Sequence, residues 1–445
     1  MIIQGRRRVG KTSLIEFSFR NEKILKIEGI EGLPEQKQIE QAQKIISRFF
    51  KDHLIEKMIC NNWGDIFEIL KIKVKKQRII LYFEEVQWLA EYKDHFAAYL
   101  KNTWDNGFQY NSNLLIILCG SSPSFMLNKI IQSKALYNRS QHILTVNPFT
   151  VEETKMFLGG IYSKISIMDT YLTLGGIPEY LKYIKKTKSL YIKICENSFR
   201  KDAPFYNEYE KIFVSALAKN KNYRKILEFL GKYRFATREQ VSKYIKQESG
   251  GGLSELLVDL EVCGFIEKIQ PYSLGPKSKL IRYSVSDSYI QFYTKFIQPL
   301  SMKIQSGQFQ EYPSNALRIN TYRQWLGYGF ERWCRREAHR ISKLLGFSSI
   351  SYVSGAYFSR ETKDTSFQID LVFDRADRVL TICEIKYKDA PVGIEVIPEF
   401  EEKINKIELK SKKTIEKVLI SANGADEKLH ARSYFDRILT LEDLL

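Results

Sequence analysis

One short pattern near the amino terminus constrains the fold of this chain more than any other feature. Gly5, Gly10, Lys11 and Thr12 follow the spacing Gly-x-x-x-x-Gly-Lys-Thr. In this pattern the glycines let backbone N–H groups turn toward a phosphate, the lysine reaches the outer phosphate oxygens, and the threonine hydroxyl holds Mg²⁺. Residues 1–4 read as a strand and residues 13–17 as the start of a helix. The pattern therefore predicts a nucleotide-binding P-loop at the edge of a parallel α/β sheet.

We expect ATP and Mg²⁺ to be the ligands of this loop. The remaining candidate ATP-binding residues are Arg8 within the loop and Ser13 at the start of the helix. The three arginines at positions 6–8 belong to the loop and are not counted as a DNA-binding patch.

Two adjacent acids follow an apolar run at residues 78–83. ATP hydrolysis on a P-loop needs one acid that holds Mg²⁺ and a neighbour that polarises the attacking water. We assign Glu84 to Mg²⁺, together with Thr12, and Glu85 to the water. The alternative is a pair of acids that simply face solvent after a strand.

The next predicted strand, Leu114–Cys119, is followed by a hydroxyl group on Ser121. Because the carboxyl ends of parallel strands meet at one edge of a sheet, this hydroxyl could contact the γ-phosphate. The same Gly-Ser-Ser segment also reads as a plain turn.

Length and composition bound the remaining possibilities. A chain of 445 residues predicts two to four domains. The 69 Lys and Arg residues against 52 Asp and Glu give a net charge of +17, which suits nucleic acid, although a lysine-rich proteome gives the same excess. Six scattered cysteines without a Cys-x-x-Cys pair argue against zinc and disulfides and for a reducing cytoplasm. No apolar run approaches the ~18 residues that span a bilayer, so no membrane association is expected.

The rhythm of predicted elements divides the chain into four parts. Residues 1–150 alternate strands and helices, 151–220 are helical, 221–285 read as a winged helix, and 286–445 form a final α/β unit. The strands expected in the first part are Met1–Gln4, Ile24–Ile27, Ile79–Phe83, Leu114–Cys119 and Ile143–Val146. The helices expected there are Phe96–Trp104 and Ser124–Gln132, and those expected in the second part are Val151–Leu158, Ile167–Leu174, Glu179–Lys186 and Leu190–Phe199.

The predicted winged helix is a poor reader of bases. A capping box at Thr237 begins its second helix, and Gly264 ends its third. That third helix, Leu253–Val262, carries the acids Glu255, Asp259 and Glu261, which would repel phosphates. The wing residues Lys277, Lys279 and Arg282 could touch a backbone but equally form a solvated turn. We therefore expect DNA binding without sequence reading by this helix, or docking on a protein.

The final α/β unit contains a second candidate site. The expected strands Phe367–Phe373 and Val379–Tyr387 form a hairpin around Asp377, which places Asp370 almost opposite Glu384. Lys386 lies two residues after Glu384 and on the same face of the strand. Two carboxylates and a lysine on one face are typical of a hard divalent cation that activates water. The alternative is a salt-bridged strand pair without metal.

The motifs together resemble a known family. The P-loop, the segment at 84–88, Gly120-Ser121-Ser122 and the segment Gly175–Leu181 look like the prokaryotic AAA-like ATPases of the STAND group, which are often archaeal. Many of these carry a C-terminal PD-(D/E)xK nuclease-type domain. The resemblance covers nearly the whole chain. It implies, in order, a parallel-sheet ATPase domain, a helical lid, a winged helix and a restriction-endonuclease-like α/β domain.

The resemblance also implies roles for single residues. Ser121 would be the hydroxyl called sensor 1, Arg139 a charge-stabilising arginine, and Glu331, in the expected helix Gly329–His339, an additional metal-binding acid. Asp370 and Glu384 would hold the metal, with Lys386 orienting water or stabilising charge. The chain departs from the family in the missing segment before Met1, in Glu84 for aspartate, and in Asn138-Arg139 where Gly-Arg is usual.

Three functional hypotheses follow. The first is a cytoplasmic, DNA-associated ATPase with a nuclease-like domain. The second is a metal-dependent DNA nuclease licensed by nucleotide, and the third is a nucleotide-gated interaction module that does not hydrolyse ATP. A protein partner or self-association is compatible with each.

Overall fold

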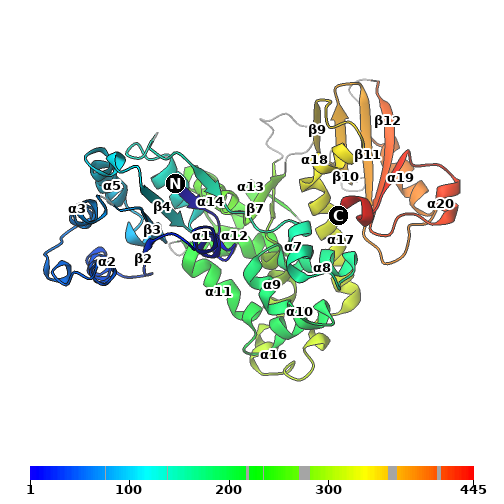
Figure 1. Cartoon of the computed structure of the whole chain (residues 1–445). Helices are drawn as coiled ribbons and strands as arrows, with labels where there is room; N and C mark the ends of the chain where they lie inside the picture. The colour runs from blue at the N-terminus through cyan, green and yellow to red at the C-terminus, as the bar shows by residue number, and fades with distance from the viewer. Residues whose placement is uncertain are drawn as a thin grey trace. The chain divides into compact units, whose positions relative to one another are not determined.

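The alternating pattern of the first 150 residues folds into a five-stranded parallel sheet with the order β2-β3-β4-β1-β5 (Figure 1). Its strands are β1 (Ile2–Gln4), β2 (Ile24–Glu28), β3 (Ile79–Glu84), β4 (Leu114–Gly120) and β5 (Ile143–Thr145). Every strand expected in this part is present, and each end lies within one residue of its expected position. The sequence prediction of a parallel α/β sheet is confirmed.

The computed structural model describes residues 1–75, 77–137, 139–216, 220–233, 235–269, 281–358, 368–407 and 412–445. These residues group into two compact units. The first unit holds residues 1–148 and 210–220, and the second holds residues 149–209 and 221–445. Residues 151–209 of the expected helical lid thus pack within the second unit. In the described part of the chain, no helix combines the length and the apolar character needed to cross a membrane.

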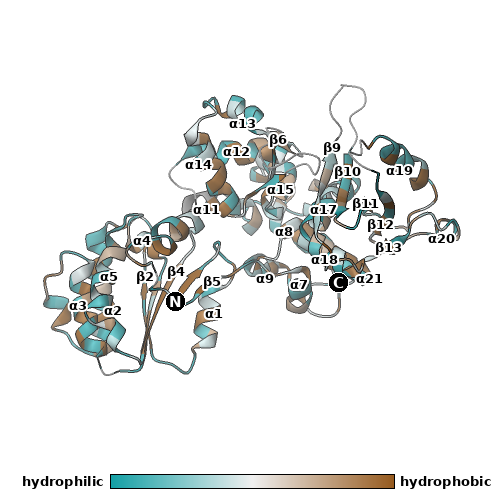
Figure 2. Cartoon of the chain, turned by 90° about the horizontal axis from the view of Figure 1, so that it is seen from above, coloured by the Kyte–Doolittle hydropathy of each residue, from teal (hydrophilic) through white to brown (hydrophobic). Residues whose placement is uncertain are grey.

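Both faces of the parallel sheet are covered, as its continuous apolar strands require. On β3, Leu81 and Phe83 pack with Trp63 and Phe67 on one face, whereas Tyr82 packs with Ile15 on the other. The strands are accordingly brown, or hydrophobic, in Figure 2. The helices of this unit are α1 (Lys11–Ser18), α2 (Glu35–Phe50), α3 (Trp63–Val74), α4 (Val86–Leu89), α5 (His95–Asp105) and α6 (Pro123–Phe125), the last continuing into a π-helical turn at Met126–Ile131.

The second unit begins with a helical segment. Its helices are α7 (Val151–Leu158), α8 (Lys164–Leu174), α9 (Pro178–Ile184), α10 (Leu190–Phe199) and α11 (Pro204–Ala216), the last of which continues into the first unit. A capping box at Thr150 begins α7, because its hydroxyl accepts from the N–H of Glu153 while the Glu153 carboxylate accepts from the N–H of Thr150.

Three helices and a three-stranded antiparallel sheet follow. Their order is α12 (Lys221–Lys232), β6 (Ala236–Thr237), α13 (Arg238–Ile245), α14 (Gly251–Val262), β7 (Ile266–Ile269) and β8 (Arg282–Val285). The capping box at Thr237 is present, and Gly264 has a φ of 72°, in the left-handed region expected for a helix end. The wing residues Lys277 and Lys279 lie outside the described residues.

A mixed five-stranded sheet with the order β13-β12-β11-β10-β9 completes the second unit. Strands β9, β10 and β11 are antiparallel, whereas β12 and β13 run parallel to β11. Their bounds are β9 (Tyr352–Phe358), β10 (Gln368–Arg375), β11 (Val379–Lys386), β12 (Thr414–Ser421) and β13 (Arg437–Leu439). The helices of this part are α15 (Ser288–Phe292), α16 (Ser301–Gln305), α17 (Ile319–Arg336), α18 (Ala338–Leu344), α19 (Val396–Asn405), α20 (Glu427–Ala431) and α21 (Leu441–Leu444). The helix expected at Gly329–His339 covers the second half of α17, the break at Glu337 and the first residues of α18.

Candidate functional site

The P-loop connects β1 to α1 with a backbone that its glycines make possible. Gly5 has a φ of 152°, and a Cβ placed on it would lie 2.3 Å from the carbonyl oxygen of Val146. Gly10 has a φ of 93° and precedes α1 without any side-chain cap. The first N–H groups of α1 therefore keep the anion-binding character of a helix amino end, which fits a phosphate.

The P-loop lysine is folded back onto its own loop. Lys11 Nζ donates to the carbonyl oxygens of Gly5, at 2.9 Å, and of Arg6, at 3.0 Å. Burial lowers the pKa of Lys11, and the nearby acids Glu84 and Glu85 oppose that shift. The ammonium group is thus held at the loop by bonds that a phosphate could replace.

Glu84, the expected Mg²⁺ ligand, lies at the end of β3 and is only 6% exposed. The Thr12 hydroxyl donates to one of its carboxylate oxygens, so the two residues assigned to Mg²⁺ are adjacent. Lys26 on β2 contacts the other oxygen at 2.5 Å. Burial acts to raise the pKa of Glu84, but hydrogen bonds from Lys26 and Thr12 hold it below its ordinary value. Glu84 is therefore a charged, oriented carboxylate.

Glu85, the expected water-polarising acid, is oriented by two polar side chains. Its backbone is left-handed, with a φ of 53°. The Ser121 hydroxyl donates to its carboxylate at 2.6 Å, and the Gln87 amide donates to the same oxygen at 2.5 Å. The hydroxyl that was expected to contact phosphate thus lies at the same edge of the sheet, where it positions Glu85.

The charge-stabilising role expected of Arg139 is not supported within this unit. Arg139 forms two hydrogen bonds to Asp105, of 2.8 Å and 3.0 Å, at the end of α5. It lines a small cavity with Met1 and Leu114, which mark the amino ends of β1 and β4. The P-loop follows the opposite end of β1, so Arg139 does not face it. Asn138, its partner in the departure from the family pattern, lies outside the described residues.

The C-terminal sheet brings the second set of candidate residues together. Leu371 pairs with Cys383 across β10 and β11, so the next pair outward is Asp370 and Glu384, as predicted. Phe367, the first residue of the expected strand, lies outside the described residues. Asp370 is 9% exposed and Glu384 is fully buried.

Two lysines neutralise Glu384. Lys403 on α19 contacts both of its carboxylate oxygens, at 2.7 Å and 3.0 Å, and Lys386 contacts one at 2.9 Å. Glu399, one turn before Lys403, lies 3.2 Å from Lys386 and 3.1 Å from Lys403. Burial acts to lower the pKa of each lysine, but Glu384 and Glu399 raise both pKa values above their ordinary range. The four side chains therefore form an alternating charge network.

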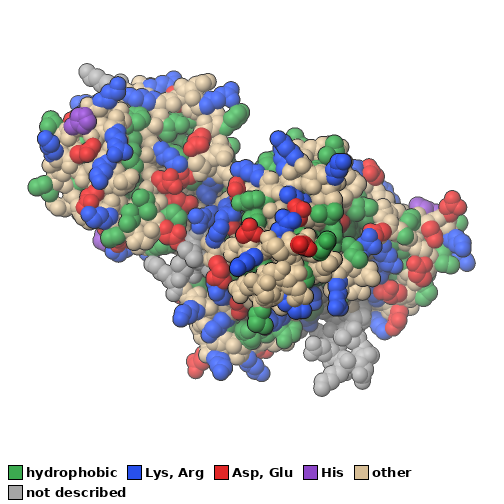
Figure 3. All heavy atoms as spheres, turned by 90° about the horizontal axis from the view of Figure 1, so that it is seen from below, with side chains coloured by type: hydrophobic (Ala, Val, Ile, Leu, Met, Phe, Trp, Pro, Cys, Tyr) green, Lys and Arg blue, Asp and Glu red, His purple; other side chains and the backbone are tan. Residues whose placement is uncertain are grey.

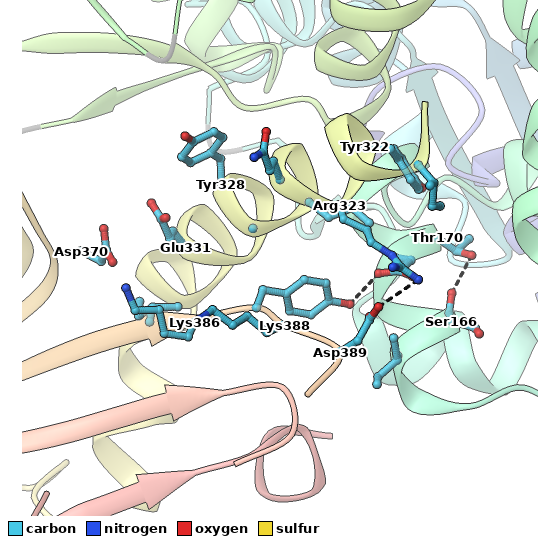
Figure 4. A pocket seen from close by; sticks show the side chains of 18 of the residues that line it. Ser166, Thr170, Tyr322, Arg323, Tyr328, Glu331, Asp370, Lys386, Lys388 and Asp389 are labelled. Carbon is cyan, nitrogen blue, oxygen red and sulfur yellow. Dashed lines mark hydrogen bonds and ion pairs between the residues drawn. The ribbon is translucent and has the colours of Figure 1, made fainter. Parts of the chain in front are cut away.

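These residues line a cavity of about 950 Å³. Figure 4 shows Glu331 of α17, Asp370 and Lys386 pointing toward one another at one end of this cavity. The three acids expected to bind a metal thus share one pocket. Among the described residues, however, no three Asp, Glu, His or Cys side chains converge closely enough to hold one ion. The donor types fit a hard divalent cation, but an ion would have to displace lysine from Glu384.

Four functional side chains escaped the sequence analysis. Lys26 and Gln87 orient the acids of the first unit, and Lys403 holds Glu384. Tyr387, directly after Lys386, donates to Asp169 on α8 at 2.6 Å. Burial raises the pKa of Asp169 to about 6. Of the four, Tyr387 adjoins a recognised motif and Gln87 lies within the segment 84–88, while the two lysines come from separate elements.

Comparison with known proteins supports the reading of the first unit. Residues 1–184 match the sequence model of a family described as an ATPase domain predominantly from Archaea. An uncharacterized protein of Methanocaldococcus jannaschii, MJECL04, is 26% identical over 396 residues, which is 87% of this chain and 83% of the relative.

Two solved structures that are similar to this chain are named as ATPases. The Walker-type ATPase PABY2304 of Pyrococcus abyssi has a TM-score of 0.46 and 18% identity, and the match covers 66% of this chain and 90% of that one. The STAND protein PH0952 of Pyrococcus horikoshii has a TM-score of 0.29 and 15% identity, and the match covers 78% of this chain and 49% of that one. Because both scores are low, the fold rests on this chain's own sheet order and on the family match. The amino-terminal part of the chain is an archaeal-type, P-loop ATPase domain.

Proposed function

We propose that this protein is a Mg²⁺-dependent ATPase of the AAA/STAND type that acts in association with DNA. The helices at 151–220 would be its lid, residues 221–285 its winged helix, and residues 286–445 a PD-(D/E)xK nuclease-like domain. The observation that carries the ATPase proposal is the convergence of Thr12, Glu84 and Glu85 beside a glycine-built phosphate loop.

Each residue would have a defined role when nucleotide is bound. The N–H groups at the start of α1, from Lys11 through Ser13, would hold the phosphates, together with the Lys11 ammonium. Thr12 and Glu84 would hold Mg²⁺, which supplies charge neutralisation at the phosphates. Glu85, oriented by Ser121, would accept a proton from the attacking water.

ATP turnover by the purified protein in Mg²⁺, with and without DNA, tests this proposal. We expect turnover that Lys11→Ala abolishes and that Lys23→Ala leaves unchanged, because Lys23 pairs with Gln77 away from the loop. Stimulation by DNA would identify the partner. Nucleotide affinity and turnover that are unchanged in Lys11→Ala would refute the ATPase assignment, and tight binding without turnover would favour a nucleotide switch.

Association with DNA is supported by charge more than by any base-reading surface. The net charge is +17, yet Figure 3 shows basic side chains scattered among acidic ones over the face in view. On α14, the helix that would enter a groove, the Asp259 carboxylate accepts from the Tyr223 hydroxyl at 2.5 Å. A carboxylate that is hydrogen-bonded to Tyr223 is not available to bind a base edge, so we propose contact with the DNA backbone without sequence preference.

A second candidate function, a metal-dependent nuclease licensed by nucleotide, is supported by the C-terminal pocket. The element order α17-α18-β9-β10-β11-α19-β12 and the adjacency of Asp370 to Glu384 fit a PD-(D/E)xK domain. The charged residues of the pocket are six acids, Asp169, Glu331, Asp370, Glu384, Asp389 and Glu399, and four bases, Arg323, Lys386, Lys388 and Lys403. This excess of carboxylates suits a divalent cation better than a bare phosphate.

Plasmid cleavage in Mg²⁺ or Mn²⁺ tests the nuclease candidate. We expect Asp370→Ala and Lys386→Ala to abolish cleavage while leaving ATP turnover intact. The absence of cleavage by the wild-type protein with every nucleotide would refute it.

A further inference from the structure

The pocket that contains Asp370, Glu384 and Lys386 is walled by helices of the preceding helical segment. Its lining includes Ser166, Asp169 and Thr170 from α8, and Tyr191 and Ile194 from α10. On each helix these residues fall on one face, because positions three or four apart are neighbours on a helix. The candidate site therefore lies at one end of a half-open pocket that α8 and α10 help to wall, and not on a flat sheet surface.

Three hydrogen bonds hold this helical wall against the C-terminal part of the unit. The Tyr387 hydroxyl donates to Asp169 at 2.6 Å, and the hydroxyls of Thr173 and Tyr322 lie 2.5 Å apart. The Tyr191 hydroxyl donates to the carbonyl oxygen of Leu317, just before α17, at 3.0 Å. Because both Thr173 and Tyr322 are buried, the wall is part of the packed core of this unit and not a loosely attached flap.

The volume of this pocket suits an unpaired strand of nucleic acid. A cavity of about 950 Å³ is in the size class that surrounds a small ligand, and it has room for a nucleotide or two. A paired helix is much larger, since its major groove alone is about 12 Å wide. Because α8 and α10 line the same pocket as Glu384, which is fully buried, we expect these helices to hinder the approach of a duplex backbone to this carboxylate.

The lining also offers what an unpaired nucleotide needs. Tyr328 on α17 is 46% exposed, and Figure 4 shows its ring near Glu331, at the end of the pocket that holds the acids. An exposed aromatic face next to a reactive centre can stack an unpaired base, whereas a paired base is already stacked in its helix. Lys388 supplies a cation in the same lining. One cavity thus contains acids that can bind a cation, a basic group that can contact the nucleic acid backbone and a ring that can stack on a base.

We propose that this pocket takes single-stranded nucleic acid, with an unpaired base stacked on Tyr328 and its phosphate directed to Asp370 and Lys386. The inference rests on the nuclease-like role proposed for the pocket and names its substrate class. Entry of a duplex requires local melting, so single-stranded regions and frayed ends are the substrates expected.

Fluorescence anisotropy with the full-length protein tests this assignment. The probe is a fluorescein-labelled DNA single strand of about twelve nucleotides, compared with the same strand annealed to its complement, in Ca²⁺ to limit cleavage. We expect the single strand to bind at least about tenfold tighter than the duplex. Tyr328→Ala should weaken single-strand binding by about tenfold and leave duplex binding unchanged. Tyr312→Ala is the matched control, because Tyr312 is an exposed tyrosine of the same unit that does not line the pocket.

Equal affinity for the two probes, or an effect of Tyr328→Ala no larger than that of Tyr312→Ala, overturns the inference. A Tyr328→Phe variant separates stacking from the hydroxyl and should bind like the wild type; loss of binding in this variant also overturns the stacking role. ATP turnover and cleavage of duplex plasmid are measured on the same samples. If plasmid cleavage persists while single-strand preference is absent, the nuclease-like role stands and only the substrate class is wrong; ATP turnover reports on the first unit separately.

Discussion

Replacing Lys26 by methionine should destabilise the first unit and change its response to Mg²⁺. Lys26 Nζ lies 2.5 Å from Glu84, and the side chains are 33% and 7% exposed, respectively. Exposed ion pairs contribute about 0–1 kcal/mol, whereas breaking a buried pair costs about 3–5 kcal/mol. An intermediate loss of about 2 kcal/mol is therefore expected, which lowers the melting temperature by roughly 4–8 °C for a unit of this size. Lys26 Nζ also lies 5.7 Å from the centre of the Tyr82 ring, and methionine is a flexible apolar side chain that can occupy the same space without the charge.

Differential scanning calorimetry in EDTA measures this loss. Mg²⁺ with ADP should then raise the melting temperature of Lys26→Met more than that of the wild type, because the cation restores the positive charge beside Glu84. The pH dependence has a definite sign. Lys26 and Thr12 hold the pKa of Glu84 below its ordinary 4.5, against the effect of burial. The stabilisation that Lys26 gives the wild-type protein through Glu84 is therefore fully present above pH 4.5. It shrinks as the pH falls below that value and Glu84 becomes protonated.

Lys23→Met is the control, since Lys23 donates to the uncharged Gln77 at 2.8 Å. The Lys23→Met substitution should change the free energy of unfolding by no more than about 0.5 kcal/mol. Equal melting temperatures for Lys26→Met and the wild type, together with equal responses to Mg²⁺, would refute the role assigned to Lys26.

Three other perturbations test separate parts of the structure. Gly5→Ala should abolish binding of a fluorescent ADP analogue and destabilise the protein, because the new Cβ would lie 2.3 Å from a backbone oxygen. Gly32→Ala is the control, since φ there is 77° and nothing lies within 4 Å of the new Cβ. It should cost only backbone strain of about 1–3 kcal/mol and leave ADP binding intact. Glu85→Gln should bind ATP normally but turn it over at least about 100-fold more slowly in a phosphate-release assay, and a smaller effect would assign the water to another residue. Asp169→Asn should raise the free energy of unfolding by up to about 3 kcal/mol at pH 8, and so raise the melting temperature, but should change neither near pH 4. The reason is that burial raises the pKa of Asp169 from 3.8 to about 6, so that the charged form, present at pH 8, is the one that costs stability. A difference that is independent of pH would contradict this reading of Asp169.

Local patterns predicted the strands of the first unit and the hairpin of β10 and β11 closely, whereas β9, β12 and β13 were not predicted. The register of the C-terminal hairpin followed from its turn alone, since a pivot at Asp377 pairs positions whose numbers are equally far from it, including Asp370 and Glu384. The helix α2, in contrast, was not predicted. Two of its buried positions are Gln38 and Gln43, whose amides donate to the carbonyl oxygens of Ile30 and Ile55. The residues of α2 are nevertheless strongly amphipathic at the helical period, so the helix itself was open to prediction, whereas the bonds of its glutamines to loop carbonyls follow only from the tertiary structure.

The residues that complete each site could not be predicted, because they come from elements distant in sequence. Lys26 reaches Glu84 only because β2 lies beside β3, and a parallel neighbour is set by topology and not by a turn. Arg139 shows the converse case. Its resemblance to a family position suggested a role at the phosphates, yet the chain places it with Asp105, at the amino ends of the strands.

Both sites hold their principal carboxylate with an ammonium group. Lys26 contacts Glu84, and Lys403 contacts Glu384 through both oxygens. A divalent cation that enters either site must therefore compete with a charge already in place, and displacing that charge is unfavourable unless new negative charge arrives with the cation. The phosphates of a nucleotide or of a nucleic acid strand supply that charge, and they also give the displaced ammonium a new partner. We therefore expect Mg²⁺ alone to leave the melting temperature of the wild-type protein unchanged, and Mg²⁺ together with ADP to raise it. Binding of the metal and of the phosphates would then be one coupled step at each site.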